Sequence, residues 1–253
     1  MLASIITSVL NARSTIEDTI TSVLEQTYKN VEYIIVGGGS TDGTTEIIKS
    51  YGKKITKFIS EPDKGIYDAM NKGILASSGD IVGFLNADDV FYDNIAIQRI
   101  VSAFTSDAID CVYGNLVYVS RQNAARITRR WRSREFCDGL FEKNWTPAHP
   151  TFYCKKDIYE RFGLYRTDFR IAADVELMYR FLQKYHIRSK YINADFVRMR
   201  DSGVSNRGIK STVVITREMK RAIIENGGQF NLIKYLFFKL LKITEFFKVH
   251  EKR

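Results

Sequence analysis

The sequence predicts an α/β fold in which a mostly parallel, Rossmann-like sheet is flanked by helices and followed by a C-terminal helical extension. Apolar, β-branched runs alternate with helical patterns through the first half of the chain. Polar or glycine-rich turns follow several of these runs, as they do at the ligand edge of parallel sheets. With 253 residues, 45% of them hydrophobic, the chain can bury one large core.

Four apolar runs are expected to form the parallel strands, at residues 2–9, 31–36, 55–60 and 81–85. Helices are expected between them, at about 15–26, 44–51 and 66–77. Ser14 followed by Glu17 predicts a capping box at the start of the first helix.

The second half predicts strands at 112–120, 151–154 and 191–199 and helices at 175–185, 210–225 and 230–253. In the 175–185 helix, we expect Leu177 to pack inward, and Glu176 and Arg180 to face solvent. Gly227 and Gly228 predict the end of the 210–225 helix.

The formal charge of +9 and the pI near 9.3 indicate an anionic partner, but nucleic acid, anionic lipid and a nucleotide-linked substrate satisfy this equally. Three cysteines lie far apart without metal-binding spacing, so we expect free thiols in a reducing compartment. Neither a signal peptide nor a run of transmembrane length is expected.

Polar residues follow three of the expected strands and should meet at one edge of the sheet. They are Asn11, the glycine-rich loop 37–44 and the group Asn86, Asp88 and Asp89. The loop brings backbone amides toward a phosphate or ribose but has neither dinucleotide-binding nor P-loop spacing, and a plain connection is the alternative. Adjacent carboxylates after a buried strand suit a metal or a ligand, and a helix N-cap is the alternative.

Three ordered stretches carry a family resemblance: SIITSVLNARSTIEDTITSVLEQTYKNVEYIIVGGGSTDGT, EPDKGIYDAMNKGI and GDIVGFLNADD. Together they resemble the inverting family 2 glycosyltransferases with the GT-A fold, in the branch that assembles bacterial surface polysaccharides. The resemblance covers about residues 2–206. It implies a GT-A domain at 1–208, with a nucleotide-sugar-binding half at 1–110 and an acceptor-binding half at 111–208, before a helical extension at 209–253.

The implied reaction moves a sugar from a nucleotide-diphosphate donor, a UDP- or GDP-sugar, to a glycan or polyprenyl-diphosphate-linked acceptor. Mg²⁺ or Mn²⁺ at Asp88 would neutralise the departing diphosphate. The resemblance places further donor-binding residues at Ser8, Asn11, Gly37, Gly38, Ser40, Asp42, Lys64, Asn71, Asn86, Asp89 and His149.

Two positions depart from the family pattern. Asn86 stands where the DxD-like motif begins with an acid, which leaves Asp88 as the chief metal ligand. Gly37 stands where the family commonly has an aspartate that touches the donor's base or ribose. The consequences allowed are relaxed nucleotide choice, compensation by Asp42 or a neighbour, and poor activity, which would make the chain a non-catalytic nucleotide-sugar binder.

Asp174 resembles the general base of the family, while an N-cap role for its carboxylate is the alternative. At a helix N-terminus, its carboxylate is expected to stay ionised. His149, on a turn beside prolines, suits a fixed site residue or a structural histidine equally. The loop at 201–206 either closes over the donor or only connects.

Two basic segments suggest surfaces. Residues 121–134 could bind nucleic acid, which is not expected, or form a solvated strand or an anionic acceptor groove. The partly amphipathic helix at 230–253 could lie on an anionic membrane or pack on the catalytic domain or a partner subunit, as in a homodimer. The expected location is the cytoplasm, peripheral to the inner face of the plasma membrane.

Overall fold

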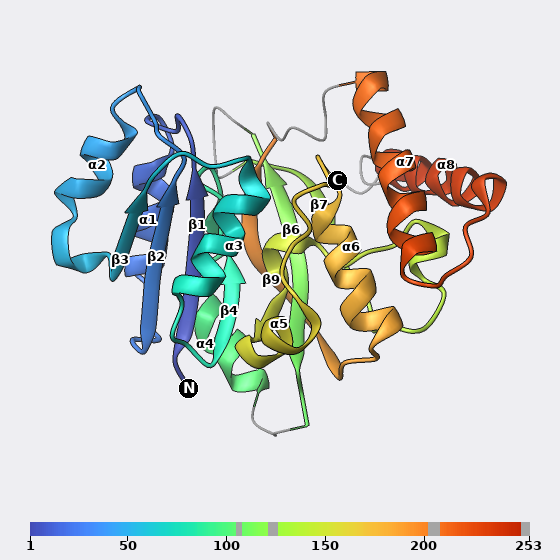
Figure 1. The fold of residues 1–253 in the computed structure, drawn as a ribbon, viewed down its shortest axis with the longest axis horizontal. Helices are drawn as coiled ribbons and strands as arrows, with labels where there is room; N and C mark the ends of the chain where they lie inside the picture. The colour runs from blue at the N-terminus through green and yellow to red at the C-terminus, as the bar shows by residue number, and fades with distance from the viewer. Residues whose placement is uncertain (105–107, 121–125, 202–207, 249–253) are drawn as a thin grey trace.

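A single mixed sheet runs through the molecule, with helices on both faces (Figure 1). The computed structural model describes residues 1–104, 108–120, 126–201 and 208–248. The strand order is β3-β2-β1-β4-β8-β6-β9-β5, and β7 pairs with β6 outside this path. The predicted α/β class is therefore confirmed.

The first half forms the parallel part of the sheet. Its strands are β1 (Ala3–Val9), β2 (Val31–Gly37), β3 (Lys57–Ser60) and β4 (Ile81–Phe84), and they pair in parallel. The intervening helices are α1 (Ile16–Leu24), α2 (Thr44–Ser50) and α3 (Ile66–Ala76). The 3-10 turn η1 (Gly52–Lys54) delays β3, which therefore begins two residues later than predicted.

The second half makes the sheet mixed. Its elements are β5 (Val90–Phe91), α4 (Ala96–Ala103), β6 (Cys111–Val119), β7 (Ile127–Trp131), η2 (Phe141–Lys143), η3 (His149–Thr151), β8 (Tyr153–Lys155), α5 (Lys156–Phe162), α6 (Ala173–Tyr179), η4 (Arg180–Lys184) and β9 (Ser189–Arg200). Strand β8 pairs antiparallel with both β4 and β6, so it joins the two halves, while β6 and β9 are parallel. The two-residue strand β5 was not predicted.

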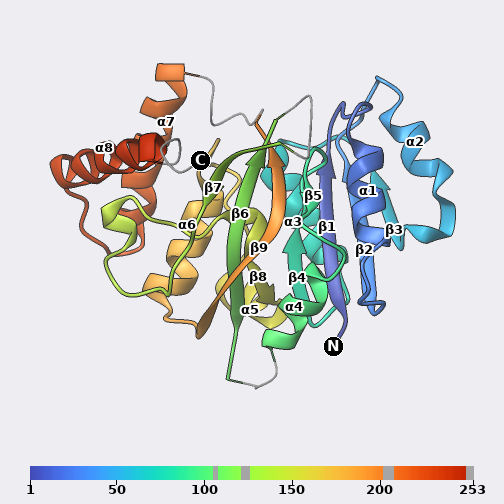
Figure 2. The ribbon, with the colours of Figure 1, turned by 180° about the vertical axis from the view of Figure 1, so that it is seen from behind.

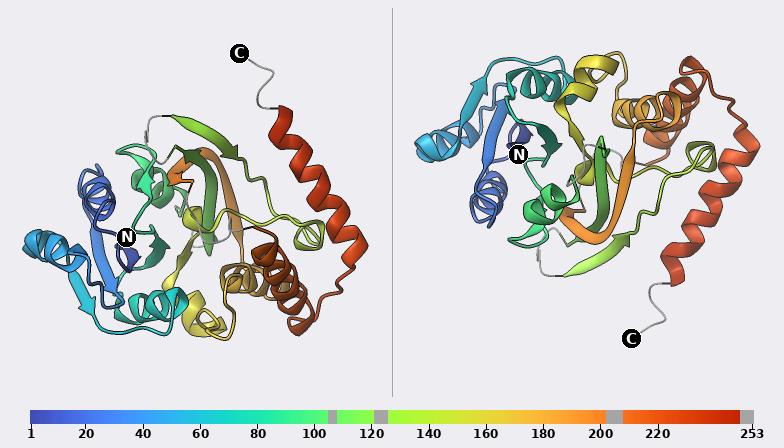
Figure 3. Two further views of the ribbon diagram at one scale, coloured as in Figure 1. Left: turned by 90° about the horizontal axis from the view of Figure 1, so that it is seen from above. Right: turned by 90° about the horizontal axis from the view of Figure 1, so that it is seen from below.

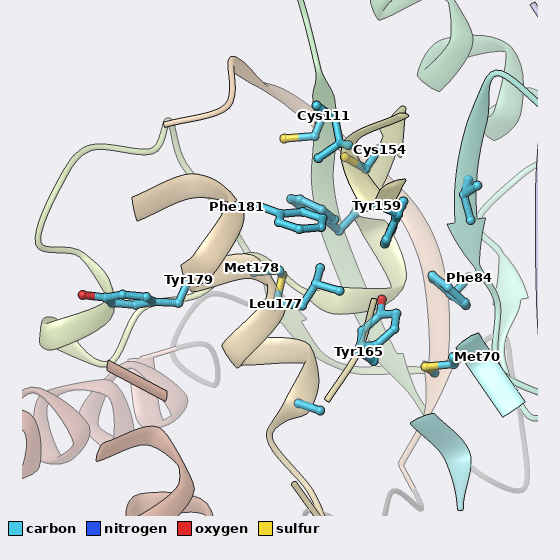
Figure 4. Packing of buried hydrophobic residues seen from close by; sticks show 14 of the residues in the cluster. Met70, Phe84, Cys111, Cys154, Tyr159, Tyr165, Leu177, Met178, Tyr179 and Phe181 are labelled. Carbon is cyan, nitrogen blue, oxygen red and sulfur yellow. The ribbon is translucent and has the colours of Figure 1, made fainter. Parts of the chain in front are cut away.

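Each face of the sheet has its own apolar core. Apolar side chains of α3, α5 and α6 pack on one face, where Met70, Tyr159 and Leu177 lie together (Figure 4). Side chains of α1, α2 and α4 pack on the other face, which is toward the viewer in Figure 2. Cys111 and Cys154 lie opposite each other in the β6–β8 pair, and all three cysteines are free thiols, as predicted.

Two local predictions are wrong. Ser14 makes no capping box, because the N-cap of α1 is Thr15 and no side-chain cap is made. The Thr15 hydroxyl instead donates to the Ala87 carbonyl at 2.8 Å. Glu176 and Arg180 do not face solvent: they form a buried ion pair, with Arg180 Nε at 3.0 Å from Glu176 Oε1. The guanidinium also donates to backbone carbonyls that follow α5, which is why the pair is buried.

Two C-terminal helices complete the chain: α7 (Gly208–Glu225) and α8 (Leu232–Lys248). The predicted stop after α7 is confirmed, because Gly227 takes a left-handed φ of 88° that suits glycine. Helix α7 packs on α6, and α8 lies beside η2 at the end of the molecule opposite α2 (Figure 3). In the parts of these helices that the structure describes, neither is apolar enough over sufficient length to cross a membrane.

Candidate active site

The loops after β1 and β2 are hydrogen-bonded to each other, which brings Asn11 and Ser40 together. The Asn11 N–H donates to Ser40 Oγ at 2.9 Å, and the Thr41 N–H donates to Asn11 Oδ1 at 3.0 Å. Asn11 takes a left-handed φ of 49°, which asparagine tolerates better than most residues. The two side chains thus shape the carboxyl edge of the sheet.

Asp42 also holds these two loops together at the same edge. Its Oδ1 accepts from the N–H of Thr44 at 3.0 Å and from the Thr44 hydroxyl, and its Oδ2 accepts from the Arg13 N–H at 3.0 Å. The hydrogen bond from the Thr44 side chain is the largest cause of a lowered Asp42 pKa. Because both oxygens already serve the loop, Asp42 is poorly suited to replace the acceptor missing at Gly37.

The backbone at Gly37 and Gly38 lies against one side chain of β3 and one of the loop that follows it. A Cβ at Gly38 would lie 2.2 Å from Asp63 Oδ2, and one at Gly37 would lie 3.3 Å from the Phe58 ring. Asp63 Oδ1 accepts from the Gly65 N–H at 2.9 Å. The Asp63 carboxylate therefore lies beside the backbone of Gly38 at this edge. We did not predict it, although the signal was present in the turn of residues 63–65.

Ser8 and Lys64 also border this edge. The Ser8 hydroxyl is buried and has no hydrogen-bond partner, which is rare for a polar group and suits one that meets a ligand. Lys64 is exposed on the turn before α3, where its N–H donates to Asp68 Oδ2 at 3.0 Å.

The residues that follow β4 divide into one partly exposed carboxylate and one buried carboxyl group. Asp89 has no exposed surface, and Asn86 Nδ2 donates to its Oδ2 at 3.1 Å. Burial, and next the charge of Asp88, raise the pKa of Asp89 well above its usual value. The donor contact predicted for Asp89 stays a prediction, and the full burial of its side chain does not favour it. Asp88 is partly exposed, and its carbonyl accepts from Arg200 Nη1 at 2.9 Å.

The Asn86–Asp88 pair fits a cation that is shared with a diphosphate. Among the described residues, no cluster of three His, Cys, Asp or Glu side chains could hold a metal by itself. Mg²⁺ commonly takes one or two carboxylates and fills its shell with substrate phosphates and water. Because Asn86 Nδ2 is bound to Asp89, its Oδ1 is the atom left to join Asp88 as a hard oxygen ligand.

Asp174 lies in the first turn of α6, and the N-cap is Ala172, so the N-cap alternative is wrong. The Tyr67 hydroxyl is 3.3 Å from Asp174 Oδ1 and also donates to the Ile171 carbonyl. Desolvation raises the pKa of Asp174, against the smaller opposing effect of His149. We had expected the helix start to keep this carboxylate ionised, but burial outweighs that effect and raises its pKa, which makes the group a stronger proton acceptor.

His149 and Asn71 both bind Tyr165 and so hold the loop that precedes α6. His149 Nε2 lies 2.7 Å from the Tyr165 hydroxyl, and burial lowers the pKa of His149. Asn71 Nδ2 donates to the Tyr165 carbonyl at 2.8 Å, and Asn71 Oδ1 accepts from the Tyr165 N–H at 2.9 Å. Both polar atoms of the Asn71 side chain thus bind the Tyr165 backbone, which is a structural role. The donor contact predicted for Asn71 stays a prediction.

A chain of ring contacts links the end of β4, which precedes Asp88, to Tyr67, the partner of Asp174. Phe84, two residues before Asn86, stacks on His149 with a centroid distance of 5.5 Å and packs edge-on against Tyr165. Tyr165 in turn stacks on Tyr67, the partner of Asp174. Asp88 and Asp174 therefore belong to elements that meet at the same end of β4.

A small cavity of about 260 Å³ opens beside Tyr67, between the start of α3 and the loop before α6. Its lining includes Lys64, Gly65, Asp168 and Arg170. The segment around residue 203 that was predicted to close over the donor lies outside the described residues.

Solved glycosyltransferases share this fold. S. aureus TarS, in complex with UDP-GlcNAc, matches with a TM-score of 0.65 and 15% identity over 91% of this chain and 68% of that one. The mannosyltransferase PcManGT from Pyrobaculum calidifontis, in complex with GDP-Man and Mn²⁺, matches with a TM-score of 0.65 and 18% identity over 90% of this chain and 65% of that one. In another crystal structure of S. aureus TarS, this chain covers 44% of that chain.

Fold and sequence together define a GT-A-type glycosyltransferase. The chain belongs to Glycosyl transferase family 2, whose model matches residues 4–167. A PGL/p-HBAD biosynthesis glycosyltransferase of Mycobacterium bovis is 27% identical over 224 residues, which are 86% of this chain and 82% of the relative. An uncharacterized glycosyltransferase of Mycobacterium tuberculosis is 31% identical over 70% of this chain and 67% of its own length.

Proposed function

We propose that this enzyme transfers one sugar, with inversion, from a nucleotide-diphosphate donor to a hydroxyl of a glycan or polyprenyl-diphosphate-linked acceptor in cell-surface polysaccharide synthesis. The observation that supports the proposal most is the buried carboxylate of Asp174, whose pKa is raised and whose partner Tyr67 is linked to the end of β4 by the ring contacts of Tyr165 and Phe84. The named relative in PGL/p-HBAD biosynthesis supports a glycoconjugate product.

Asp174 acts as the general base. It removes the proton of the acceptor hydroxyl as that oxygen attacks the anomeric carbon, and the bond from that carbon to the diphosphate breaks with its electron pair going to the phosphate oxygen. The raised pKa makes the carboxylate a stronger proton acceptor than that of an exposed aspartate. His149, whose pKa is lowered, stays neutral and supports the site through Tyr165.

Asp88, with the amide oxygen of Asn86, would hold Mg²⁺ or Mn²⁺. A bound cation supplies neutralisation of the negative charge on the leaving diphosphate. The Mn²⁺ complex of PcManGT supports this assignment.

The donor lies against the edge formed by Ser8, Asn11, Gly37 and Gly38. Asp63 supplies the acceptor for a base N–H that Gly37 lacks, because its Oδ2 lies beside the Gly38 backbone. The bare Gly37 lets the nucleobase approach the Phe58 ring. The donors bound by structural neighbours, UDP-GlcNAc and GDP-Man, support a UDP- or GDP-sugar.

Helix α8 places the enzyme on the inner face of the plasma membrane, near a lipid-linked acceptor. Its inner side packs through the buried Tyr235, while one continuous stripe of large apolar residues is exposed. The stripe consists of Leu232, Ile233, Leu236, Phe237, Leu240 and Leu241. The exposed Lys234 borders it and suits anionic headgroups.

A vesicle experiment tests the membrane contact. The protein should sediment with vesicles of phosphatidylglycerol, and far less with phosphatidylcholine, because apolar burial and charge act together. Ile233→Glu should abolish sedimentation, whereas Lys53→Glu, an exposed charge change on the distant turn η1, should preserve most of it. Equal sedimentation of Ile233→Glu and the unchanged protein would exclude the stripe.

The experiment that tests the function is a thermal-shift panel of UDP, GDP, UDP-GlcNAc and GDP-mannose with and without Mn²⁺. A nucleotide sugar that binds the folded state should raise Tm further as its concentration increases, approximately with the logarithm of concentration above Kd, and Mn²⁺ should enlarge that shift. Mn²⁺-dependent turnover of the selected donor would then separate an enzyme from a non-catalytic binder. A panel in which no nucleotide changes Tm would contradict both.

The basic segment at 127–134 is assigned to the acceptor side, and nucleic acid is not proposed. Arg130 pairs with Asp195, and Arg129 lies 3.6 Å over the Tyr118 ring centroid, so part of this charge is already used within the protein.

A further inference from the structure

Helix α7 contacts the loop that leads into α6, whose first turn carries the proposed base, Asp174. Both Asp174 and α7 lie after the matched family segment, residues 4–167. The carboxylate of Glu218 on α7 accepts hydrogen bonds from three consecutive backbone N–H groups. These come from Arg170 at 2.8 Å, Ile171 at 2.9 Å and Ala172 at 2.9 Å. Ala172 is the N-cap of α6, two residues before Asp174.

These three bonds hold the backbone that leads into α6. Arg170 and Ile171 precede the helix, and Ala172 is its N-cap, which makes no side-chain cap of its own. Glu218 therefore satisfies three backbone N–H groups of this segment from another helix. The backbone that enters α6 is consequently held by α7.

Tyr67 holds the same segment from the other side. Its hydroxyl donates to the Ile171 carbonyl and lies 3.3 Å from Asp174 Oδ1. Ile171 is therefore held at its N–H by α7 and at its carbonyl by α3, and the Asp174 carboxylate is held by the same tyrosine.

An ion-pair cluster gives α7 a second attachment to this loop. Asp168 binds both Arg166 and Arg221, and Glu225 binds the same two arginines. These charges are exposed, and each pair is expected to contribute little stability by itself. They hold the loop to α7 without touching the backbone at residues 170–172.

We propose that Glu218 and Tyr67 are positioning residues for the general base, and that α7 is thereby part of the catalytic apparatus. The inference rests on the proposed function of Asp174. Neither side chain takes the acceptor proton. Together they set the first turn of α6, so that the Asp174 carboxylate meets the acceptor hydroxyl, and a misplacement of about 1 Å can cost on the order of 100-fold in rate.

Glu218→Gln tests the α7 contact, with Glu225→Gln as its matched control on the same helix. Glutamine offers one oxygen where the carboxylate offers two, so its NH₂ group must face at least one of the three backbone N–H groups. With the Mn²⁺ complex of UDP-GlcNAc or GDP-mannose, whichever donor is turned over, kcat should fall roughly 10- to 100-fold in Glu218→Gln. KM for the donor should change little, and Glu225→Gln should stay within about threefold of the unchanged protein.

Tyr67→Phe tests the α3 contact through the pH profile. The hydrogen bond from Tyr67 lowers the pKa of Asp174, so its loss raises that pKa. The base works only when deprotonated, and the acidic limb of the kcat/KM profile should therefore move to higher pH. Tyr28→Phe, which removes a hydroxyl that donates to the Met1 carbonyl far from the site, should leave the limb in place.

Hydrogen exchange gives a readout that does not need turnover. The amides of residues 170–172 should exchange at least tenfold faster in Glu218→Gln than in Glu225→Gln, because only the first variant releases them. Should Glu218→Gln fail to fold, Glu218→Asp keeps the charge but shortens the reach, and the same acceleration is expected.

The outcomes separate this inference from the function on which it rests. Suppose first that Asp174→Asn inactivates the enzyme. If amide exchange at residues 170–172 is then unchanged in Glu218→Gln, or if the Glu218→Gln kcat and the Tyr67→Phe acidic limb are unchanged, the positioning roles alone are overturned. An Asp174→Asn enzyme that retains its rate would overturn the proposed base and this inference together.

Discussion

The donor edge and the base segment are held in place in different ways. At the donor edge, residues 11–13 and 40–44 bond to each other through short loops that directly follow adjacent strands. At the base segment, residues 165–174 are held by side chains from α3 and α7, which lie about 100 residues before it and about 45 residues after it. The first arrangement is built into the sheet, whereas the second depends on tertiary contacts.

This contrast explains what each region can do. The donor edge presents backbone groups and the unpartnered Ser8 hydroxyl, which suits a ligand with many phosphate and ribose oxygens. The base segment presents one carboxyl group whose pKa is raised by its surroundings. We therefore propose that the donor edge binds the nucleotide and that the base segment accepts the proton.

Asp88→Asn should have the largest effect on the donor side. Removing the carboxylate leaves no charged protein ligand for the cation, and stabilisation worth several kcal/mol, on the order of 1000-fold in rate, should be lost. The Mn²⁺-dependent part of the thermal shift with UDP or GDP should vanish in parallel. An Asp88→Asn protein that keeps its Mn²⁺-dependent shift would remove Asp88 from the metal site.

Among changes near the base segment, Glu176→Gln should have the largest effect on stability. Breaking a buried ion pair leaves the Arg180 charge uncompensated, and the free energy of unfolding should fall by about 3 kcal/mol. Asp157→Asn, in the exposed Arg161–Asp157 pair, should change it by less than about 1 kcal/mol. Denaturant titration measures both, and equal losses would argue against a buried anchor under α6.

Gly38→Ala should weaken nucleotide binding more than Gly37→Ala. A methyl group at Gly38 collides with Asp63 Oδ2, whereas one at Gly37 meets the Phe58 ring at 3.3 Å, which a small movement relieves. We expect about a tenfold higher Kd for the preferred nucleotide in Gly38→Ala, equivalent to about 1.4 kcal/mol. Calorimetry measures both Kd values. A larger loss of affinity in Gly37→Ala than in Gly38→Ala would contradict the assignment of Asp63 to the binding site.

Asp89→Asn should produce the smallest effect, visible in the pH dependence of stability. The folded-state pKa of Asp89 is raised, so the folded protein binds the proton more tightly and gains stability as pH falls through that pKa. Asparagine imitates the protonated form at every pH. The variant should therefore exceed the unchanged protein in Tm at pH 8, and the difference should narrow toward acidic pH; a constant difference would contradict the raised pKa.

The same contrast decides how much could be predicted from the sequence. The four parallel strands and their polar loops were predicted because each run and its turn are local in sequence, and Asn11 and Ser40 do meet. The prediction that Glu176 faces solvent was wrong, since its partner, the buried Arg180, is set by tertiary packing. The hydrogen bonds between Asn71 and the Tyr165 backbone depend on the same packing and were not predicted. Glu218 could not be foreseen at all, because nothing near it in sequence marks the amides that it binds.

Asp63 is an intermediate case between the residues that could be predicted and those that could not. Its turn is readable in the sequence, but its approach to Gly38 depends on how β3 aligns with β2. Local patterns thus locate the donor edge, whereas residue roles require the fold.

The most direct measurement is single-turnover transfer by Asp174→Asn, with the donor that the thermal-shift panel selects. Asparagine keeps the size of the side chain but cannot accept the proton, so the rate of the chemical step should fall by roughly 1000-fold, while donor affinity stays within about threefold because the donor edge is separate. A variant that transfers sugar at the rate of the unchanged enzyme would contradict the assignment of Asp174 as the base.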